Sequence, residues 1–201
     1  MMDRLQSALD ALAGGRMIII TGDRLRGGDI DFCMAARHVT PDAINFMATH
    51  GRGLICLALT PKRASDLGIE LINPGPDQQS GRPHGRSIEA ARGVTTGISA
   101  ADRAHTIKVA VAPDTTAGDL VSPGHVFPLI TAEGGVSVRP AAAEASIELC
   151  RRAGAGDAAV ICSIMRDDGE MARIEDIGHL VSERGLQVCD IAQLLELRGE
   201  E

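Results

Sequence analysis

Short apolar runs alternate along this chain with signals that start and stop helices. The runs at residues 17–20, 54–59 and 158–165 have the length of buried strands rather than of helices. Thr40 and Thr60 each precede a proline, which places a capping hydroxyl and a proline at the start of a helix. Strands and helices therefore interleave, but without a strict strand–helix–strand rhythm. This pattern predicts a single α+β domain over residues 1–201, a mixed α/β sandwich.

The remaining elements follow from the same kinds of signal. Residues 73–86 are rich in proline and glycine and carry no large apolar side chain, so we expect an exposed, mobile loop there. A hairpin turn is expected at residues 166–169. Helices are expected at residues 6–13, 41–50, 61–68, 99–105, 141–153, 174–183 and 191–197, and further strands at 32–36, 126–130, 136–138 and 188–191.

The core has to be aliphatic, because the chain has three Phe and neither Tyr nor Trp, although 44% of it is apolar. This apolar content excludes a disordered chain. A net charge of −7 without a basic stripe argues against nucleic acid as a partner, and no apolar run reaches the ~18 residues of a membrane span. The N-terminus lacks a signal-peptide pattern and the five cysteines form no CxxC pair, which predicts reduced thiols in a cytoplasmic protein.

The stretch GVTTGISAA, residues 93–101, is the clearest candidate for a binding turn. Thr95 and Thr96 stand between two glycines, so the turn is tight and carries two hydroxyls. Backbone and hydroxyl donors in such a turn can approach an anionic group closely. Clusters of glycine and threonine are also common in ordinary loops, so this interpretation depends on the rest of the chain.

Several blocks of the chain match one enzyme family in order and spacing. They are HVTPDAINFMATHGRGLICLALTPKRASDLGIEL, SIEAARGVTTGISAADRAHTI, PGHVFPL and MRDDGEMAR. In these blocks the chain resembles the 3,4-dihydroxy-2-butanone 4-phosphate synthases of riboflavin biosynthesis. The resemblance implies an α+β fold and a homodimer whose active sites lie near the subunit interface. It also implies the conversion of ribulose 5-phosphate to 3,4-dihydroxy-2-butanone 4-phosphate and formate, with Mg²⁺ or Mn²⁺ stabilising the enediolate.

The acidic loop of that family reads approximately DDEDRENEGD and aligns with residues 22–31 without a gap. Arg26 then matches the motif arginine, Asp29 its second glutamate and Asp31 its final aspartate. The first glutamate of the motif, a metal ligand and catalytic residue in the family, is replaced by Gly27.

A second departure lies in the segment that reads RxGHTEA in the family. Arg139 is kept, but the metal-binding histidine is replaced by Ala142 and the phosphate-contacting threonine by Ala143. A third departure is Ser163, where the family has a glutamate after the cysteine of its strand. Because glycine and alanine supply no side-chain ligand, the resemblance at Gly27 and Ala142 predicts that the chain binds no metal cofactor.

The pocket that remains carries donors, acids and a thiol. Every one of these residues also has a structural alternative: an ordinary loop arginine, solvated loop carboxylates, a surface salt bridge, turn hydroxyls, a buried core thiol or a structural histidine. The predicted catalytic residues are His125, Cys56, Asp29 and Asp31, and the predicted substrate-binding residues are Arg26, Thr95, Thr96 and Arg139.

Three hypotheses about function follow. The leading one is a repurposed enzyme that keeps the fold and acts on a small polar or anionic metabolite by metal-independent acid–base or thiol chemistry. One alternative is a non-catalytic binding or partner subunit. The other is a genuine synthase that converts ribulose 5-phosphate. We expect a homodimer with a small-molecule substrate as its main partner, although a partner subunit could instead use the family's dimer surface to bind a genuine synthase.

Overall fold

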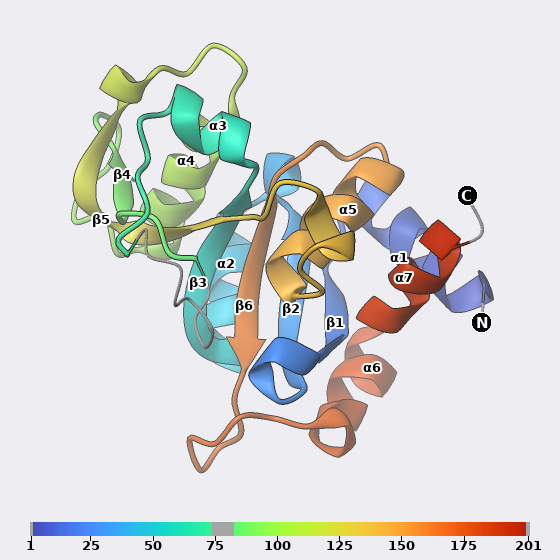
Figure 1. Ribbon diagram of the computed structural model, residues 1–201. Coiled ribbons are helices and arrows are strands. Elements are labelled where there is room, and N and C mark those ends of the chain that lie inside the picture. The colour runs from blue at the N-terminus through green and yellow to red at the C-terminus, as the bar shows by residue number, and fades with distance from the viewer. Residues whose placement is uncertain (1, 74–82, 200–201) are drawn as a thin grey trace.

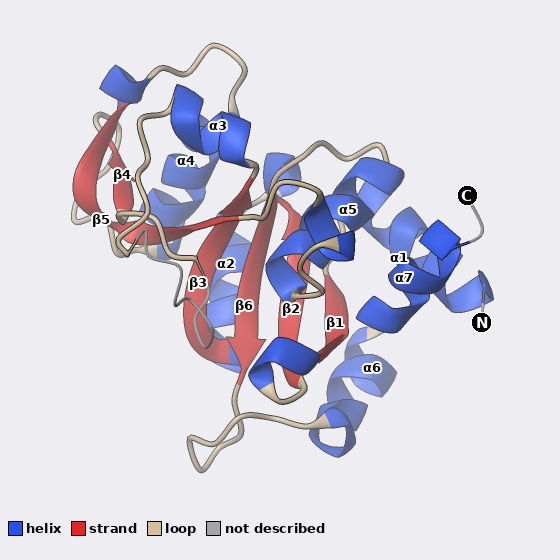
Figure 2. Cartoon of the chain, viewed as in Figure 1, coloured by secondary structure: helices blue, strands red, loops and turns tan. Residues whose placement is uncertain are grey.

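A computed structural model describes residues 2–73 and 83–199 (Figures 1 and 2). Within these residues, one mixed sheet has the strand order β4-β5-β3-β6-β2-β1-β7. Strands β3 and β5, and β1 and β7, pair in parallel, whereas the other neighbours are antiparallel. The strands are β1 Ile18–Asp23, β2 Asp29–Ala35, β3 Arg52–Leu59, β4 Ile88–Ala90, β5 Leu120–Ile130, β6 Ala159–Ile164 and β7 Gln187–Asp190.

Helices cover both faces of the sheet, with α5 on the near face in Figure 1 and α2 behind the strands. The α-helices are α1 Met2–Ala13, α2 Pro41–Phe46, α3 Pro61–Asp66, α4 Ala100–Val111, α5 Ala142–Arg152, α6 Gly178–Arg184 and α7 Ile191–Gly199. Shorter turns are η1 Arg24–Arg26, η2 Ala36–His38, η3 Met47–Gly51 (a π-helical turn), η4 Ala117–Asp119, η5 Gly135–Ser137 and η6 Ile174–Ile177.

Two apolar cores lie on opposite faces of the sheet, because successive side chains of a strand point to opposite sides. On β2, Phe32 and Met34 face a core shared with α2, α4 and α6. Cys33 and Ala35 face a second core, shared with α1, α5 and α7. The predicted α+β sandwich with an aliphatic core is therefore confirmed. Within the described residues, none of the helices is long and apolar enough to cross a membrane.

The helix starts predicted from Thr-Pro pairs are confirmed. The Thr40 hydroxyl accepts a hydrogen bond from the backbone N–H of Ala43 at 3.1 Å, and Thr60 accepts one from Arg63 at the same distance. Each hydroxyl therefore satisfies one of the N–H groups that a helix leaves unpaired in its first turn.

Other predicted elements differ from the structure. Residues 136–138 form part of the turn η5 instead of a strand, because the N–H groups of Val138 and Arg139 bond back to the carbonyl of Gly135. Strand β5 starts six residues before the predicted strand at 126–130, despite the proline and glycine within it. Strand β2 begins at Asp29, so Asp29 and Asp31 lie in a buried strand. Most of the predicted loop at 73–86, residues 74–82, lies outside the described residues.

Candidate active site

Three carboxylates gather where the β1–β2 hairpin meets the start of α5. Asp23 ends β1 and is the register partner of Asp29, which begins β2. Asp31 lies two residues further along β2 and therefore on the same side of the sheet as Asp29. Asp23, Asp29 and Asp31 are 1%, 5% and 0% exposed. Burying carboxylates is costly unless they are paired, so their partners define this site.

Asp29 is held between two arginines. Arg26 Nη2 lies 2.8 Å from one carboxylate oxygen of Asp29, and Arg173 Nη1 lies 3.3 Å from the other. Arg26 comes from the η1 turn, which ends at Gly27 with a left-handed φ of 65°. Arg173 comes from the segment after β6, far away in the sequence. One buried carboxylate therefore meets two positive charges.

Asp23 and Asp31 each accept a hydrogen bond from a neighbouring element. The backbone N–H of Ala142, the first residue of α5, donates to Asp23 Oδ2 at 3.0 Å. A carboxylate in this place also interacts favourably with the positive end of the helix dipole. The Ser163 hydroxyl donates to Asp31 Oδ1 at 2.8 Å across the β2–β6 ladder. Ser163 and Ala142 thus contact two of the three carboxylates directly.

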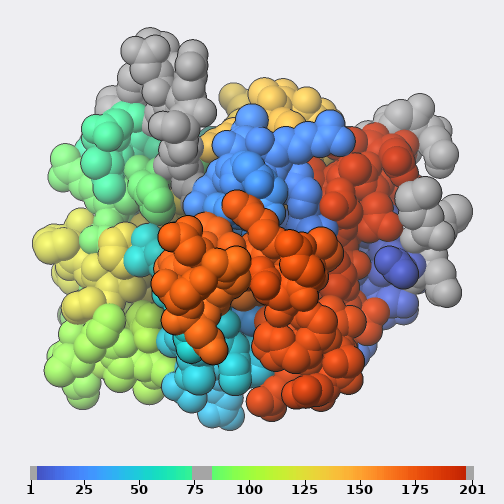
Figure 3. Space-filling view, turned by 90° about the horizontal axis from the view of Figure 1, so that it is seen from below, coloured from blue at the N-terminus to red at the C-terminus, as the bar shows by residue number. Residues whose placement is uncertain are grey.

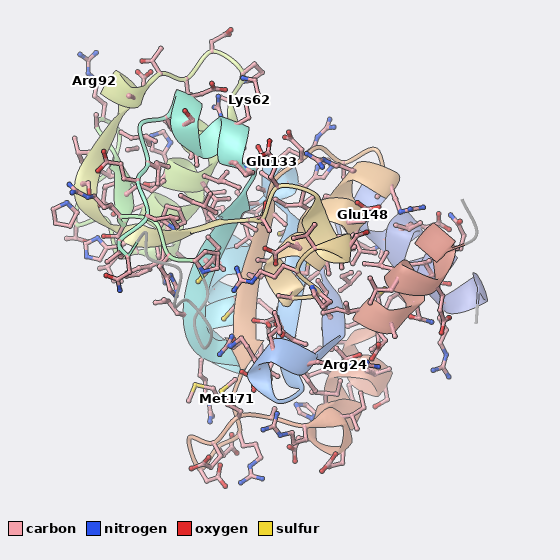
Figure 4. All side chains as sticks on the ribbon, in the orientation of Figure 1. Arg24, Lys62, Arg92, Glu133, Glu148 and Met171 are labelled. Carbon is pink, nitrogen blue, oxygen red and sulfur yellow. The ribbon has the colours of Figure 1, made fainter. Side chains whose placement is uncertain are left out.

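Glu144 stands in the first turn of α5 and fixes the predicted substrate-binding residue Arg139. Arg139 Nη1 lies 3.6 Å from Glu144 Oε1, and the same oxygen accepts a hydrogen bond from Ala132 N–H at 2.9 Å. Oε2 has no hydrogen-bond partner within the described part of the chain. Burial raises the pKa of the Glu144 carboxyl, against the opposing effects of these two contacts. Figure 4 labels Glu133 and Glu148, which line a pocket of about 320 Å³ that Glu144 also borders.

The threonine turn is organised by Asp102, in the first turn of α4. Thr95 N–H and the Thr95 hydroxyl donate to the Asp102 carboxylate at 3.2 and 2.9 Å, and Gly97 N–H donates at 3.0 Å. The hydrogen bond from the Thr95 hydroxyl is the main cause that lowers the pKa of Asp102. Thr96 is exposed beside this turn. The hydroxyl proton of Thr95 is therefore directed toward Asp102, which leaves this oxygen only as an acceptor of further hydrogen bonds.

His125 and Cys56 occupy neighbouring parts of the sheet with different access. His125 lies on β5, its side chain 41% exposed, and its Nδ1 is 2.9 Å from Glu89 Oε2 on β4. Cys56 on β3 is the register partner of Phe127 and is fully buried, as are the other cysteines. The burial of Cys56 agrees with its structural alternative, a core thiol, and its catalytic role stays a prediction.

The structure thus divides the predicted site residues into two groups in one chain. Arg26, Asp29 and Asp31 lie on the β1–β2 side next to the start of α5. Thr95 and His125 lie around β4 and β5, which the order of the sheet separates from β2 by two strands, and Figure 1 shows β4 and β5 at the opposite edge.

Sequence reasoning missed several residues that complete these groups. Asp23, Arg173 and Glu89 were not among the predicted residues. Arg173 meets Asp29 across 144 residues of sequence, and Glu89 meets His125 across 36. The sequence block MRDDGEMAR, which ends at Arg173, was the only feature that could have pointed to this arginine. No local sequence pattern indicates an ion pair between residues so far apart in the chain.

A separate surface pocket of about 460 Å³ lies beyond the end of β6. Figure 3 views the molecule from below and shows the segment after β6 in orange, spread between the blue β1–β2 turn and the cyan residues near position 50. His50, Arg52, Arg166 and His179 are among the residues that line this pocket. It contains none of the predicted site residues.

Comparison with known proteins identifies the family. The sequence matches the family model for 3,4-dihydroxy-2-butanone 4-phosphate synthase over residues 6–197. The chain belongs to this family. The riboflavin biosynthesis protein RibBA of Aquifex aeolicus is 46% identical over 96% of this chain, which spans only 48% of that protein. The synthase of Chromobacterium violaceum is 40% identical, over 96% of this chain and 92% of its own length.

A solved synthase is similar to this family member in fold as well. Its structure, in complex with two magnesium ions, superimposes with a TM-score of 0.91 at 32% identity, over 98% of this chain and 96% of that one. This likeness in sequence and fold, over nearly the whole length of both chains, supports the family assignment.

The prediction of no metal cofactor is wrong, because a close structural relative in the family was solved with two magnesium ions. The prediction considered only the missing side chains at Gly27 and Ala142. It treated Asp29 and Asp31 as acid–base groups alone and overlooked Asp23. Mg²⁺ takes hard oxygen ligands and is usually held by one or two carboxylates, with water and substrate oxygens completing its shell.

These carboxylates fit such a partial site. Within the described residues, no three His, Cys, Asp or Glu side chains gather closely enough to enclose a metal by themselves. Both oxygens of Asp29 face arginines, so Asp31 and Asp23 are the candidates to supply one or two oxygens to a divalent ion. Water and substrate would have to supply the remaining ligands.

The stability of the protein should depend on pH through Glu144. Because its pKa is raised in the folded state, the folded protein holds this proton more tightly than the unfolded chain does. The free energy of unfolding should therefore fall as the pH rises from about 4.5, the ordinary value, through the raised one. Glu144→Gln should remove this part of the slope in urea titrations, whereas the exposed control Glu175→Gln should leave it unchanged. An unaltered slope in Glu144→Gln would contradict the prediction.

Proposed function

We propose that this chain is a genuine synthase that converts ribulose 5-phosphate to 3,4-dihydroxy-2-butanone 4-phosphate and formate with a divalent cation. The observation that carries the proposal is the buried carboxylate site at the start of α5, where Asp29 lies between Arg26 and Arg173. Relatives at 40–46% identity that bear the synthase or riboflavin-biosynthesis name support it. The hypothesis of a repurposed, metal-independent enzyme finds no comparable support.

The arginines suit a phosphate group. Arg26 Nη1 is buried and has no hydrogen-bond partner among the described residues, so it has a donor to offer an anion. A guanidinium group binds phosphate through fixed, paired donors, which gives both strength and orientation. We assign the substrate phosphate to Arg26 and Arg139.

The carboxylates suit the proton transfers of an enolisation. Asp29 and Asp31 lie on one side of β2, and proton transfer by a positioned carboxyl group typically contributes about 10²–10⁴-fold in rate. A bound divalent ion would polarise the carbonyl and hydroxyl oxygens of the sugar. Asp31 is aligned by Ser163 and Asp29 by its arginines, so both groups are held in place before substrate arrives.

We also propose that the protein is a homodimer and cytoplasmic. Ile98 and Val121 are 53% and 50% exposed. Val121 is the register partner of Glu89, and Ile98 follows the threonine turn, so both lie beside the His125 group. A second copy covering these side chains would remove apolar surface from water.

The test is the release of formate by the purified chain. Incubation with ribulose 5-phosphate and Mg²⁺ should give formate at a steady rate, measured by coupling to a formate dehydrogenase. Chelation with EDTA should lower the rate by at least about 100-fold, and excess Mg²⁺ should restore it, because metal polarisation is worth several kcal/mol. No formate above the level of a heat-denatured sample would reject the synthase and favour the repurposed enzyme.

A further inference from the structure

We propose that Glu89 is the positioning residue of His125: it fixes the imidazole in the tautomer with the proton on Nδ1 and leaves Nε2 open to the substrate. The role of Glu89 and His125 in catalysis rests on the proposed function. The pair itself rests on geometry alone, and the two can be tested separately.

The contact between Glu89 and His125 is built by an irregular strand pairing. The register of β4 and β5 jumps between Ile88, opposite Val126, and Glu89, opposite Val121. The residues of β5 within this jump are bulged, and a bulge re-aims a side chain relative to the regular ladder. His125 lies at the end of the bulge, with Nδ1 2.9 Å from Glu89 Oε2.

Gly124 makes this arrangement possible. A Cβ at Gly124 would lie 2.1 Å from the carbonyl carbon and oxygen of Ile88, which is closer than atoms can approach. The backbone of the β5 bulge can therefore approach the backbone of β4 this closely only because residue 124 has no side chain. The Gly124 N–H donates to the Ser87 hydroxyl at 3.1 Å, which anchors the bulge. The glycine before His125 in PGHVFPL thus serves to place the imidazole.

The threonine turn covers the other oxygen of Glu89. Oε1 is buried without a hydrogen-bond partner in the described residues. A Cβ at Gly97 would lie 1.8 Å from this oxygen, and Gly97 has a φ of +82°, so the turn can pack against the carboxylate only with a glycine here. Asp102 holds the turn in this position through Thr95 and Gly97. The Glu89 side chain is 13% exposed as a result.

The chemistry of the pair follows from its donors and acceptors. An ionised carboxylate only accepts hydrogen bonds, so the ring nitrogen facing Glu89 has to carry the proton. A neutral imidazole then has its lone pair on Nε2. In this state Nε2 can accept a proton from the substrate, and the electron pair of the broken bond stays on the substrate. The imidazolium charge that forms lies next to Glu89, and the return of the proton to the substrate restores neutral His125.

The experiment reads the tautomer by ¹⁵N NMR of protein labelled in histidine, at alkaline pH, where imidazoles are neutral. Protonated and bare ring nitrogens differ strongly in ¹⁵N shift, and His125→Gln assigns the signals. The wild type should show Nδ1 protonated and Nε2 bare. Glu89→Leu removes the acceptor and should move the proton to Nε2, whereas Glu70→Gln, at an exposed carboxylate, should change nothing. A wild-type His125 with its proton on Nε2 overturns the proposal, even if Glu89→Leu fails to fold.

Turnover adds a second readout. Glu89→Gln should lower kcat for formate release by about 10- to 100-fold, the usual loss when an orienting partner is removed, with KM within about twofold. If kcat were unchanged in a variant whose His125 tautomer has switched, the contact between Glu89 and His125 would have no role in catalysis. If the wild type releases no formate, the proposed function fails, while the NMR result still decides whether Glu89 sets the tautomer.

Discussion

Replacing Asp29 by Asn is expected to lower formate release by about 10²–10⁴-fold, the contribution of a positioned acid–base group. Asparagine has nearly the same shape, but it cannot take up a proton or balance the charges of Arg26 and Arg173, which lie 2.8 and 3.3 Å away. The loss should appear in kcat measured at saturating Mg²⁺ and ribulose 5-phosphate.

The matched control for this variant is Asp42→Asn, which changes an exposed carboxylate in the first turn of α2. Its kcat should equal that of the wild type. Circular dichroism should show that Asp29→Asn is folded, since Arg26 and Arg173 are partly exposed and water can compensate for the lost partner. If Asp29→Asn were as fast as Asp42→Asn, the carboxylate would have no part in the reaction.

The largest loss of stability is expected from Phe32→Ala. Phe32 is 0% exposed in the middle of β2, and its ring meets that of Phe46 edge-on, with 5.5 Å between the centroids. Removing a buried phenylalanine deletes its transfer free energy and leaves a cavity, which together cost about 3–5 kcal/mol. For a chain of this size the melting temperature should fall by roughly 6–20 °C.

The comparison for Phe32→Ala is Leu54→Ala, at a side chain that is 47% exposed. That substitution should change the free energy of unfolding by no more than about 0.5 kcal/mol. Urea titration of both variants measures the difference directly. A loss below about 1 kcal/mol in Phe32→Ala would mean that this side chain does not fill the core between β2 and α2.

Much of the fold could be predicted because its signals are local. The capping hydroxyl of Thr60 and the proline after it act within one helical turn, and the structure has the helix where they place it. Short apolar runs became β1, β3 and β6 for the same reason. Two elements were predicted wrongly. Strand β5 continues through Pro123 and Gly124 because β4 pairs with residues on both sides of them, and residues 136–138 bond back to their own turn.

The site was only partly predictable. Matching motifs pointed to Arg26, Asp29 and Asp31, which the structure does place together. The error about the metal came from reading Gly27 and Ala142 in isolation, as single lost ligands. Carboxylates supplied by neighbouring strands were not considered as oxygen ligands, although Mg²⁺ needs few of them from the protein.

The sequence by itself determined the family, the helix starts and the aliphatic core of this protein, because these depend on residues that are neighbours in the chain. Only the tertiary structure decided what each candidate side chain contacts. Arg173 reaches Asp29 across 144 residues, and Ser163 reaches Asp31 across 132. The GVTTG turn itself binds inward to Asp102 and covers Glu89. Such contacts depend on how strands and helices pack in space, and no local pattern of residues records that packing.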